Sequence, residues 1–244
     1  ILSALLLSLN PMVSFQEPEE TELEAAQRKV AELEAELGPE HLDLVGSLKS
    51  VMMIYYGQGQ YGEAAEVYRR VLSLEEKALG PEHPDVAQSL NNLAFLLHAQ
   101  GSYSEARPLY ERSLAILEKA LGPEHPNVAA SLMTDGWLLQ AQGSYSEARP
   151  LYERSLAIRE KALGPEHPDV ATALNNLALL LHAQGSYSEA RPLCERSLAI
   201  REKVLGPEHP NVALSLNNLA ALLRAQGSYA EARPLYERSL AIRE

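Results

Sequence analysis

Apolar side chains recur along this chain at spacings of three and four residues, the period of an amphipathic helix. Between positions 170 and 184, one such stripe consists of Val170, Leu174, Leu177, Ala178 and Leu181. Gly185 ends this helix, and a second stripe follows, which consists of Ala190, Leu193, Cys194, Ser197, Leu198 and Leu205. Apolar and polar residues do not alternate with period two in this segment, so the pattern predicts helices and no strands.

Local signals predict where each helix begins. Pro168 occupies a first helical position, where its missing N–H costs nothing, and Asp169 follows at the positive end of the helix. Ser186 and Glu189 have the spacing of a capping box, which predicts that the second helix begins directly after the first. The short turn forces an antiparallel pair. A proline inside each second helix predicts a local bend; these prolines are Pro108, Pro150, Pro192 and Pro234.

This helix pair is repeated along the chain. The tetrapeptide GPEH occurs five times at intervals of 42 residues, beginning at Gly38, Gly80, Gly122, Gly164 and Gly206. The pattern predicts repeats at 38–79, 80–121, 122–163, 164–205 and 206–244, the last one truncated, after a capping helix or partial repeat at 20–37. One pair cannot bury its apolar faces alone, so stacked pairs predict an all-α fold, an α-solenoid.

Composition and charge exclude several classes of function. Apolar residues make up 46% and charged residues 22% of the chain, as in a folded protein. The net charge of -12 repels a phosphate backbone, so no nucleic-acid partner is expected. Cys194 is the single cysteine, which excludes a disulfide within the chain and a cysteine-based zinc site. Because Cys194 stands where other repeats have tyrosine, it is predicted to be a core residue.

The first nine residues, ILSALLLSL, are almost wholly apolar and are followed by Asn10 and Pro11. Two interpretations are open. Residues 1–14 are the remnant of a signal peptide, which would make the protein exported or periplasmic; or residues 1–19 form an apolar segment that packs on the end of the array of a cytoplasmic protein. The segment is too short to span a bilayer, and membrane association is expected only if it is retained.

Signs of catalytic or metal chemistry are absent from the sequence. Five histidines occupy the same place in the GPEH turn, just before a helix, which predicts helix capping or turn packing; they are His41, His83, His125, His167 and His209. His98 and His182 lie too far apart in a repeat array to share a metal. No zinc-protease, P-loop or dinucleotide-binding motif is present. We therefore expect no enzymatic activity, no metal and no small-molecule cofactor.

The repeated pattern LNNLA…AQGSYSEARPLYERSLAI resembles the tetratricopeptide repeat. The 42-residue unit, with GPEHPDVA before the first helix, resembles the kinesin-light-chain subclass as found in bacterial repeat proteins. The resemblance covers roughly residues 20 to 244. It implies a right-handed superhelix whose first helices line a concave groove for peptides or partner domains. The heptad-like stripe before residue 38 spans only about two heptads, too short for the coiled coil of a motor-linked light chain.

The resemblance also implies which side chains line the groove. They lie ten, nine, six and three positions before the glycine that ends each first helix. Partner contacts are expected from Asn91, Asn92, Phe95 and His98, from Thr134, Trp137 and Gln140, from Asn175, Asn176, Leu179 and His182, and from Asn217, Asn218 and Arg224. The other matching positions are Lys49, Ser50, Met53, Tyr56, Met133 and Ala221. Most of these positions are neutral.

The roles of several groove residues have alternatives. A carboxamide can pair with both groups of a peptide backbone, so a column of asparagines suits a bound chain. The alternative is that Asn92, Asn176 and Asn218 brace a neighbouring helix. Trp137, the single tryptophan, is either a ligand anchor or a partly buried packing residue.

The third repeat departs from the pattern. It has Asp135 and Gly136 where the second repeat has Leu93 and Ala94. The leucine position is predicted to be core, so Asp135 must find a partner or raise its pKa. One hypothesis is that this irregularity widens the groove near Trp137; the other is sequence drift that the array tolerates.

The leading hypothesis from sequence is a scaffold or adaptor that binds a peptide or partner protein in the concave groove. One alternative is a sensor or regulatory repeat region of a longer protein, with a catalytic or signalling domain outside this segment. Another is a structural spacer with no groove ligand.

Overall fold

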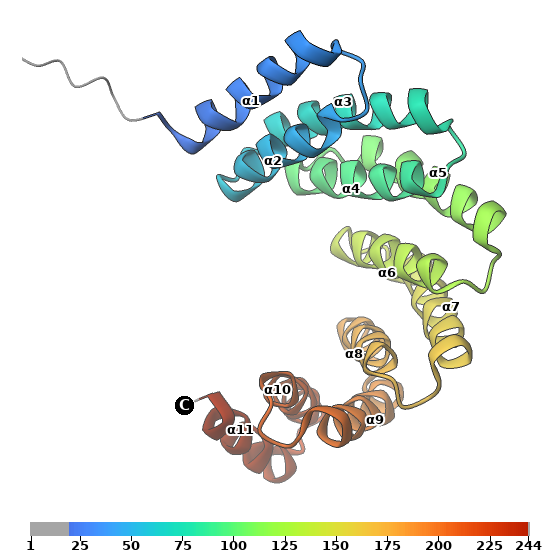
Figure 1. Cartoon of the computed structure of the whole chain (residues 1–244). Helices are drawn as coiled ribbons and strands as arrows, with labels where there is room; N and C mark the ends of the chain where they lie inside the picture. Colours follow the sequence, from blue (N-terminus) through green and yellow to red (C-terminus); the bar gives the residue numbers. More distant parts are fainter. Residues whose placement is uncertain (1–19, 244) are drawn as a thin grey trace, which may run out of the picture.

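The computed structural model describes residues 20–243, in which eleven α-helices and no strand are present (Figure 1). The helices are α1 (Glu22–Leu37), α2 (Leu44–Gly57), α3 (Tyr61–Leu79), α4 (Pro84–Gln100), α5 (Tyr103–Leu121), α6 (Pro126–Ala141), α7 (Tyr145–Leu163), α8 (Pro168–Ala183), α9 (Tyr187–Leu205), α10 (Pro210–Ala225) and α11 (Tyr229–Arg243). The prediction of an all-α fold is confirmed. The apolar segment at residues 1–19 lies outside the described residues.

The helices form antiparallel pairs that stack into an open arc, as the repeat pattern predicts. Figure 1 shows α4, α6, α8 and α10 along the inner side of the arc and α5, α7 and α9 along the outer side. Each pair packs on its neighbours in sequence, and distant pairs do not touch one another within residues 20–243. The fold is therefore an α-solenoid. None of its helices is long and apolar enough to cross a bilayer.

The histidine–proline pairs begin the inner helices. His83 is the N-cap of α4, and its Nδ1 accepts a hydrogen bond from the Asp85 N–H at 3.2 Å. Pro84 follows at the first helical position, where no N–H is needed. His125, His167 and His209 form the same bond at 3.1 Å at the starts of α6, α8 and α10. The capping interpretation of these histidines is confirmed.

The predicted capping box at the start of α9 is wrong. The Ser186 side chain makes no capping hydrogen bond, and its backbone carbonyl accepts the N–H groups of Glu189 and Ala190 instead. The Glu189 carboxylate accepts a hydrogen bond from Arg149 of the preceding repeat at 2.8 Å. The Glu189 carboxylate, which the local spacing predicted to cap α9, therefore forms an ion pair between repeats instead.

Close approach of small residues joins the two helices of each repeat. Four fully buried serines of the second helices donate a 2.7 Å hydrogen bond to an alanine carbonyl of the first helix; the pairs are Ser113–Ala87, Ser155–Ala129, Ser197–Ala171 and Ser239–Ala213. All eleven helices run unbroken between their ends, including those that contain a proline. Cys194 is buried in the core as predicted, and burial raises the pKa of its thiol to about 11.

Ion pairs connect successive outer helices on the solvent side. Arg107, Arg149 and Arg191 each bind a glutamate on the next outer helix at 2.8–2.9 Å; these glutamates are Glu147, Glu189 and Glu231. Because these pairs are exposed, each contributes little stability. Their regular spacing favours one register between repeats.

Ser197 on α9 and Ser186, the residue directly before α9, provide a matched pair for a stability test. We expect Ser197→Ala to lower the free energy of unfolding by about 1 kcal/mol, since a buried hydrogen bond to Ala171 is lost. We expect Ser186→Ala to cost less than about 0.5 kcal/mol, because its hydroxyl caps nothing. Urea denaturation followed by far-UV circular dichroism measures both. An equal loss of unfolding free energy in the two variants would contradict the finding that the Ser186 hydroxyl does not cap α9.

Candidate functional site

Three aromatic side chains form a continuous row along the inner face of the first three repeats. Tyr56 on α2, Phe95 on α4 and Trp137 on α6 contact one another in order, with ring centroids 6.0 and 6.2 Å apart. Tyr56 is 36% exposed and Trp137 is 44% exposed, although both are large and mostly apolar. We call these three residues the aromatic row.

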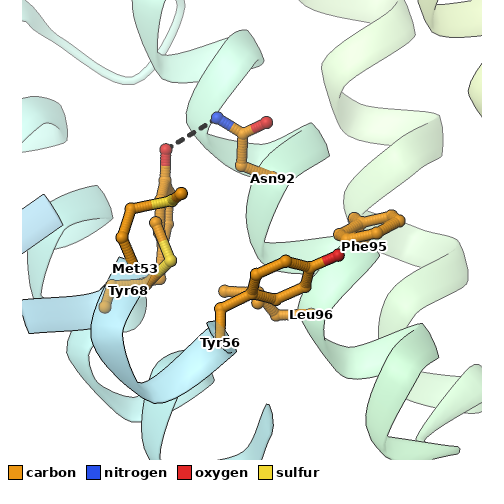
Figure 2. A pocket seen from close by; sticks show the side chains of 7 residues that line it. Met53, Tyr56, Tyr68, Asn92, Phe95 and Leu96 are labelled. Carbon is orange, nitrogen blue, oxygen red and sulfur yellow. Dashed lines mark hydrogen bonds between the residues drawn. The ribbon is translucent and has the colours of Figure 1, made fainter. Parts of the chain in front are cut away.

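An apolar pocket opens beside the first two members of this row. Its volume is about 300 Å³, and its lining is Met52, Met53, Tyr56, Tyr68, Asn92, Phe95 and Leu96. Figure 2 shows Tyr56 and Phe95 approaching from two different helices, with the Asn92 amide directed at the Tyr68 hydroxyl. The pocket offers thioether and aromatic surface, which suits a large apolar side chain.

A more polar pocket lies on the other side of Phe95, between α4 and α6. Its volume is about 250 Å³, and its lining is Gln88, Asn91, Asn92, Phe95, Asn127, Ala130, Ser131 and Thr134. Phe95 and Asn92 line both pockets. The groove therefore places carboxamide groups directly beside apolar surface.

The asparagines that the sequence predicted for the groove use their amide N–H groups within the array. Asn92 Nδ2 donates to the Tyr68 hydroxyl at 2.8 Å, and Asn218 Nδ2 donates to Asn175 Oδ1 at 2.9 Å. Asn176 Nδ2 lies 3.1 Å from the Met133 sulfur. These contacts join neighbouring repeats, as the bracing alternative describes.

The first asparagine of each pair lies deeper. Asn91 and Asn175 are buried, and Asn91 exchanges hydrogen bonds of 3.3 and 3.4 Å with Ser131 of the next repeat. Asn217 is half-buried. Binding of a partner by these carboxamides stays a prediction.

His98 lies beneath two aromatic rings. Its imidazole is 4.8 Å from Trp137 and 5.0 Å from Tyr103, measured between ring centroids. Neither ring nitrogen has a hydrogen-bond partner in residues 20–243, and burial lowers the pKa of His98. His182 holds the same place in the fourth repeat and stacks on Tyr187, but it is only half-buried.

The other predicted groove residues differ in their surroundings. Leu179 and Arg224 are exposed on the later repeats. Gln140 accepts a hydrogen bond from the Tyr152 hydroxyl at 3.1 Å, and the Thr134 hydroxyl donates to the Ala130 carbonyl. Within residues 20–243, ring contacts between neighbouring repeats join only groove residues of the first three repeats into one surface.

The groove carries little charge. Among the predicted groove positions, only Lys49 and Arg224 are charged. Lys49 is 2.9 Å from the buried Glu75 carboxylate, which also accepts a hydrogen bond from Ser89. Acidic surface elsewhere accounts for the net charge of -12. Residues 20–243 contain no cluster of three or more histidine, cysteine, aspartate or glutamate side chains able to hold a metal ion.

The sequence pattern missed residues that complete the groove. Met52 and Leu96 line the apolar pocket from positions next to predicted ones. Tyr61 and Tyr103 begin the second helices and stack on Tyr56 and His98. Their place directly after the turn, opposite the end of the first helix, was the signal that could have found them.

Asp135 is half-buried on the side of α6 that faces the outer helices, and its carboxylate has no hydrogen bond or ion pair in the described part of the chain. Burial raises its pKa to about 6, with a further contribution from Glu111. Gly136 lies against the Tyr152 ring, where an added Cβ would be only 3.0 Å from the nearest ring atom. The predicted raised pKa is confirmed.

The paired helices and the open inner face define the class: an α-solenoid. A family model described as tetratricopeptide repeat matches residues 51–119, 85–161, 136–191 and 169–244. The chain belongs to the tetratricopeptide repeat family.

Several solved structures are similar to this chain in shape. Putative kinesin light chain nearly identical TPR-like repeats from Podosopora anserina are 35% identical, with a TM-score of 0.72, covering 83% of this chain and 96% of that one. BtubC (BKLC) from P. vanneervenii is 24% identical, with a TM-score of 0.77 and 91% coverage of each chain. Aspartyl phosphate phosphatase F from Bacillus subtilis is 13% identical, with a TM-score of 0.72, covering 87% of this chain and 54% of that one. No curated protein matches the sequence.

These similarities confirm the resemblance to kinesin-light-chain-like repeats. Identities below a quarter show the fold alone, so the second and third structures support the solenoid and nothing about ligands. Tetratricopeptide repeat arrays are in general non-catalytic scaffolds for protein–protein interaction.

The hydrogen bond between Asn92 and Tyr68 predicts a specific stability loss. Asn92→Ala leaves the buried Tyr68 hydroxyl without a partner, so we expect a loss of about 1–3 kcal/mol. Adding Tyr68→Phe removes the orphaned group and should recover part of that loss. Asn176→Ala is the matched control and should cost less, since its amide reaches only a sulfur. Equal losses for Asn92→Ala and Asn176→Ala in urea denaturation would refute the bracing role.

Asp135 predicts a pH-dependent stability difference. Its pKa is raised in the folded state, so the stability that its proton contributes is present below the unfolded value and is lost as pH rises through about 6. Asp135→Leu should therefore raise the melting temperature more at about pH 8 than at about pH 5. Thermal melts at the two pH values measure the difference, and a gain that is equal at both would exclude a titrating buried carboxyl.

Proposed function

We propose that this protein is an adaptor that binds a peptide or a partner protein in its concave groove, with the aromatic row as the anchor point. The observation that carries the proposal is the row itself. Tyr56 and Trp137 are exposed on the face that the stacked helices leave open, and the half-buried Phe95 contacts both of them. Contiguous apolar surface of this kind marks interaction sites, and buried aromatic anchors supply much of the binding energy of interfaces.

The two pockets specify the kind of segment that fits. The apolar pocket beside Tyr56 accepts a large apolar or aromatic side chain. The polar pocket beyond Phe95 offers carboxamide and hydroxyl groups, which pair with the backbone of an extended segment. Since the groove is nearly uncharged, the bound segment is expected to be neutral where it meets the row.

The family supports a binding role for this face. Tetratricopeptide repeat arrays act as protein–protein scaffolds, and the predicted groove positions of this solenoid differ from repeat to repeat. The later repeats have Leu179 and Ala221 where the row has Phe95 and Trp137. Anchoring is therefore assigned to the first three repeats.

Selection of peptides from a displayed random library on the full 244-residue chain tests the proposal. We expect enriched sequences to contain a large apolar residue. Phe95→Ala and Trp137→Ala should each lower the affinity for the selected peptides about tenfold or more, on the order of 1.4 kcal/mol. Fluorescence polarisation of a labelled peptide measures this affinity.

Leu240→Ala is the matched control, because Leu240 is also an exposed apolar residue (59%) but lies on α11, away from the row. The affinity of Leu240→Ala for the selected peptides should stay within about twofold of that of the wild type. If the selected peptides bind Phe95→Ala and Trp137→Ala with the same affinity as the wild type, the binding site lies elsewhere on the chain. Failure to enrich any sequence would favour a spacer without a groove ligand.

A further inference from the structure

The junction between α5 and α6 is built differently from the other junctions between repeats. Leu93, Leu177 and Leu219 are almost fully buried at the position that Asp135 occupies in the third repeat. Accordingly, α5 packs against α6 less extensively than α3 packs against α4 or α9 against α10.

A hydrogen bond that closes the preceding junction is missing here. Tyr68 on α3 accepts from Asn92 on α4 at 2.8 Å. The counterpart of Tyr68 is Tyr110 on α5, whose buried hydroxyl has no partner in residues 20–243. Thr134 stands in the place of Asn92, and its short side chain donates to its own helix instead. The centre of the junction therefore lacks both a packed leucine and a cross-helix hydrogen bond.

The charges that face Asp135 make its ionised form costly. Glu111 on α5 and Glu147 on α7 are the neighbouring carboxylates, and Arg107 on α5 is the neighbouring cation. The Arg107 guanidinium already donates to Glu111 at 3.0 Å and to Glu147 at 2.9 Å. An ionised Asp135 would be a third carboxylate around one guanidinium. Tyr110 on α5, whose pKa is raised by burial, is the remaining titratable group at this face.

The same helix carries the third member of the aromatic row. Trp137 lies two residues after Asp135 and contacts Phe95 and His98 on α4. A shift of α6 against α5 therefore also shifts Trp137 against Phe95. We propose that the α5–α6 junction is a proton-controlled joint: loss of the Asp135 proton loosens it and changes the spacing of the aromatic row across the groove. The consequence for ligand binding rests on the proposed function; the joint itself does not.

The joint can be tested on the full chain without any ligand. Trp137 is the single tryptophan, so its emission reports on the row directly, and solution X-ray scattering reports on the curvature of the array. Both are measured from about pH 5 to about pH 8. We expect the wild type to show one transition in emission, centred near pH 6, with a change in radius of gyration over the same range.

Three variants assign the transition. Asp135→Asn is uncharged at every pH, and Asp135→Leu restores the residue of the other repeats, so both should abolish the transition. His98→Gln removes the other group beside Trp137 that titrates near neutral pH, and the transition should persist in it. Far-UV circular dichroism checks that each variant is folded. The two Asp135 variants remove the carboxyl group with different side chains, so the same result in both assigns the transition to that group.

Three outcomes would overturn the proposal. The first is a wild type with no transition in emission or radius of gyration. The second is a transition that survives in Asp135→Asn and Asp135→Leu. The third is a transition that disappears in His98→Gln, which would assign it to that imidazole. If the joint titrates as expected but no displayed peptide binds the groove, the proposed function fails and the joint stands.

Discussion

The structure depends on the packing of each helix pair against the next one. Each inner helix buries one stripe against its own partner and the preceding outer helix, so no pair is complete alone. The buried serine–alanine contacts, such as Ser155 to Ala129, hold the two helices of a repeat at close distance. Because the same contacts recur every 42 residues, the array curves regularly and leaves the inner helices facing an open groove (Figure 1).

This arrangement separates the residues that maintain the fold from those that can bind. Side chains such as Val170 and Leu174 are fully buried and belong to the shared core. Exposed groove positions such as Trp137 and Leu179 point away from it, whereas Asn92 also bonds to Tyr68 of the neighbouring repeat. Phe95 and Trp137 form a row with Tyr56, whereas the later repeats carry smaller residues at the same places. The aromatic row therefore lies on the first three repeats of the array.

A linear array also confines defects. Asp135 and Gly136 replace core residues in one repeat, yet α6 keeps its full length and its buried neighbours Leu132 and Leu138. In a globular core, a buried carboxylate would disturb contacts in every direction; here its effect reaches only the adjacent helices. The defect lies two residues before Trp137, the third member of the aromatic row.

The sequence alone determined the helices and their pairing in outline, because helical period, prolines and glycines act within a few residues. It also determined the histidine caps and the buried Cys194, since both follow from position in one repeat. Only the tertiary structure decided the rest. Glu189 pairs with Arg149 and does not form the predicted capping box, and the amide of Asn92 donates to the Tyr68 hydroxyl. The rings of Phe95, His98 and Trp137 contact one another across two repeats. In each case the partner lies in a neighbouring repeat, at a distance along the chain that local pattern does not encode.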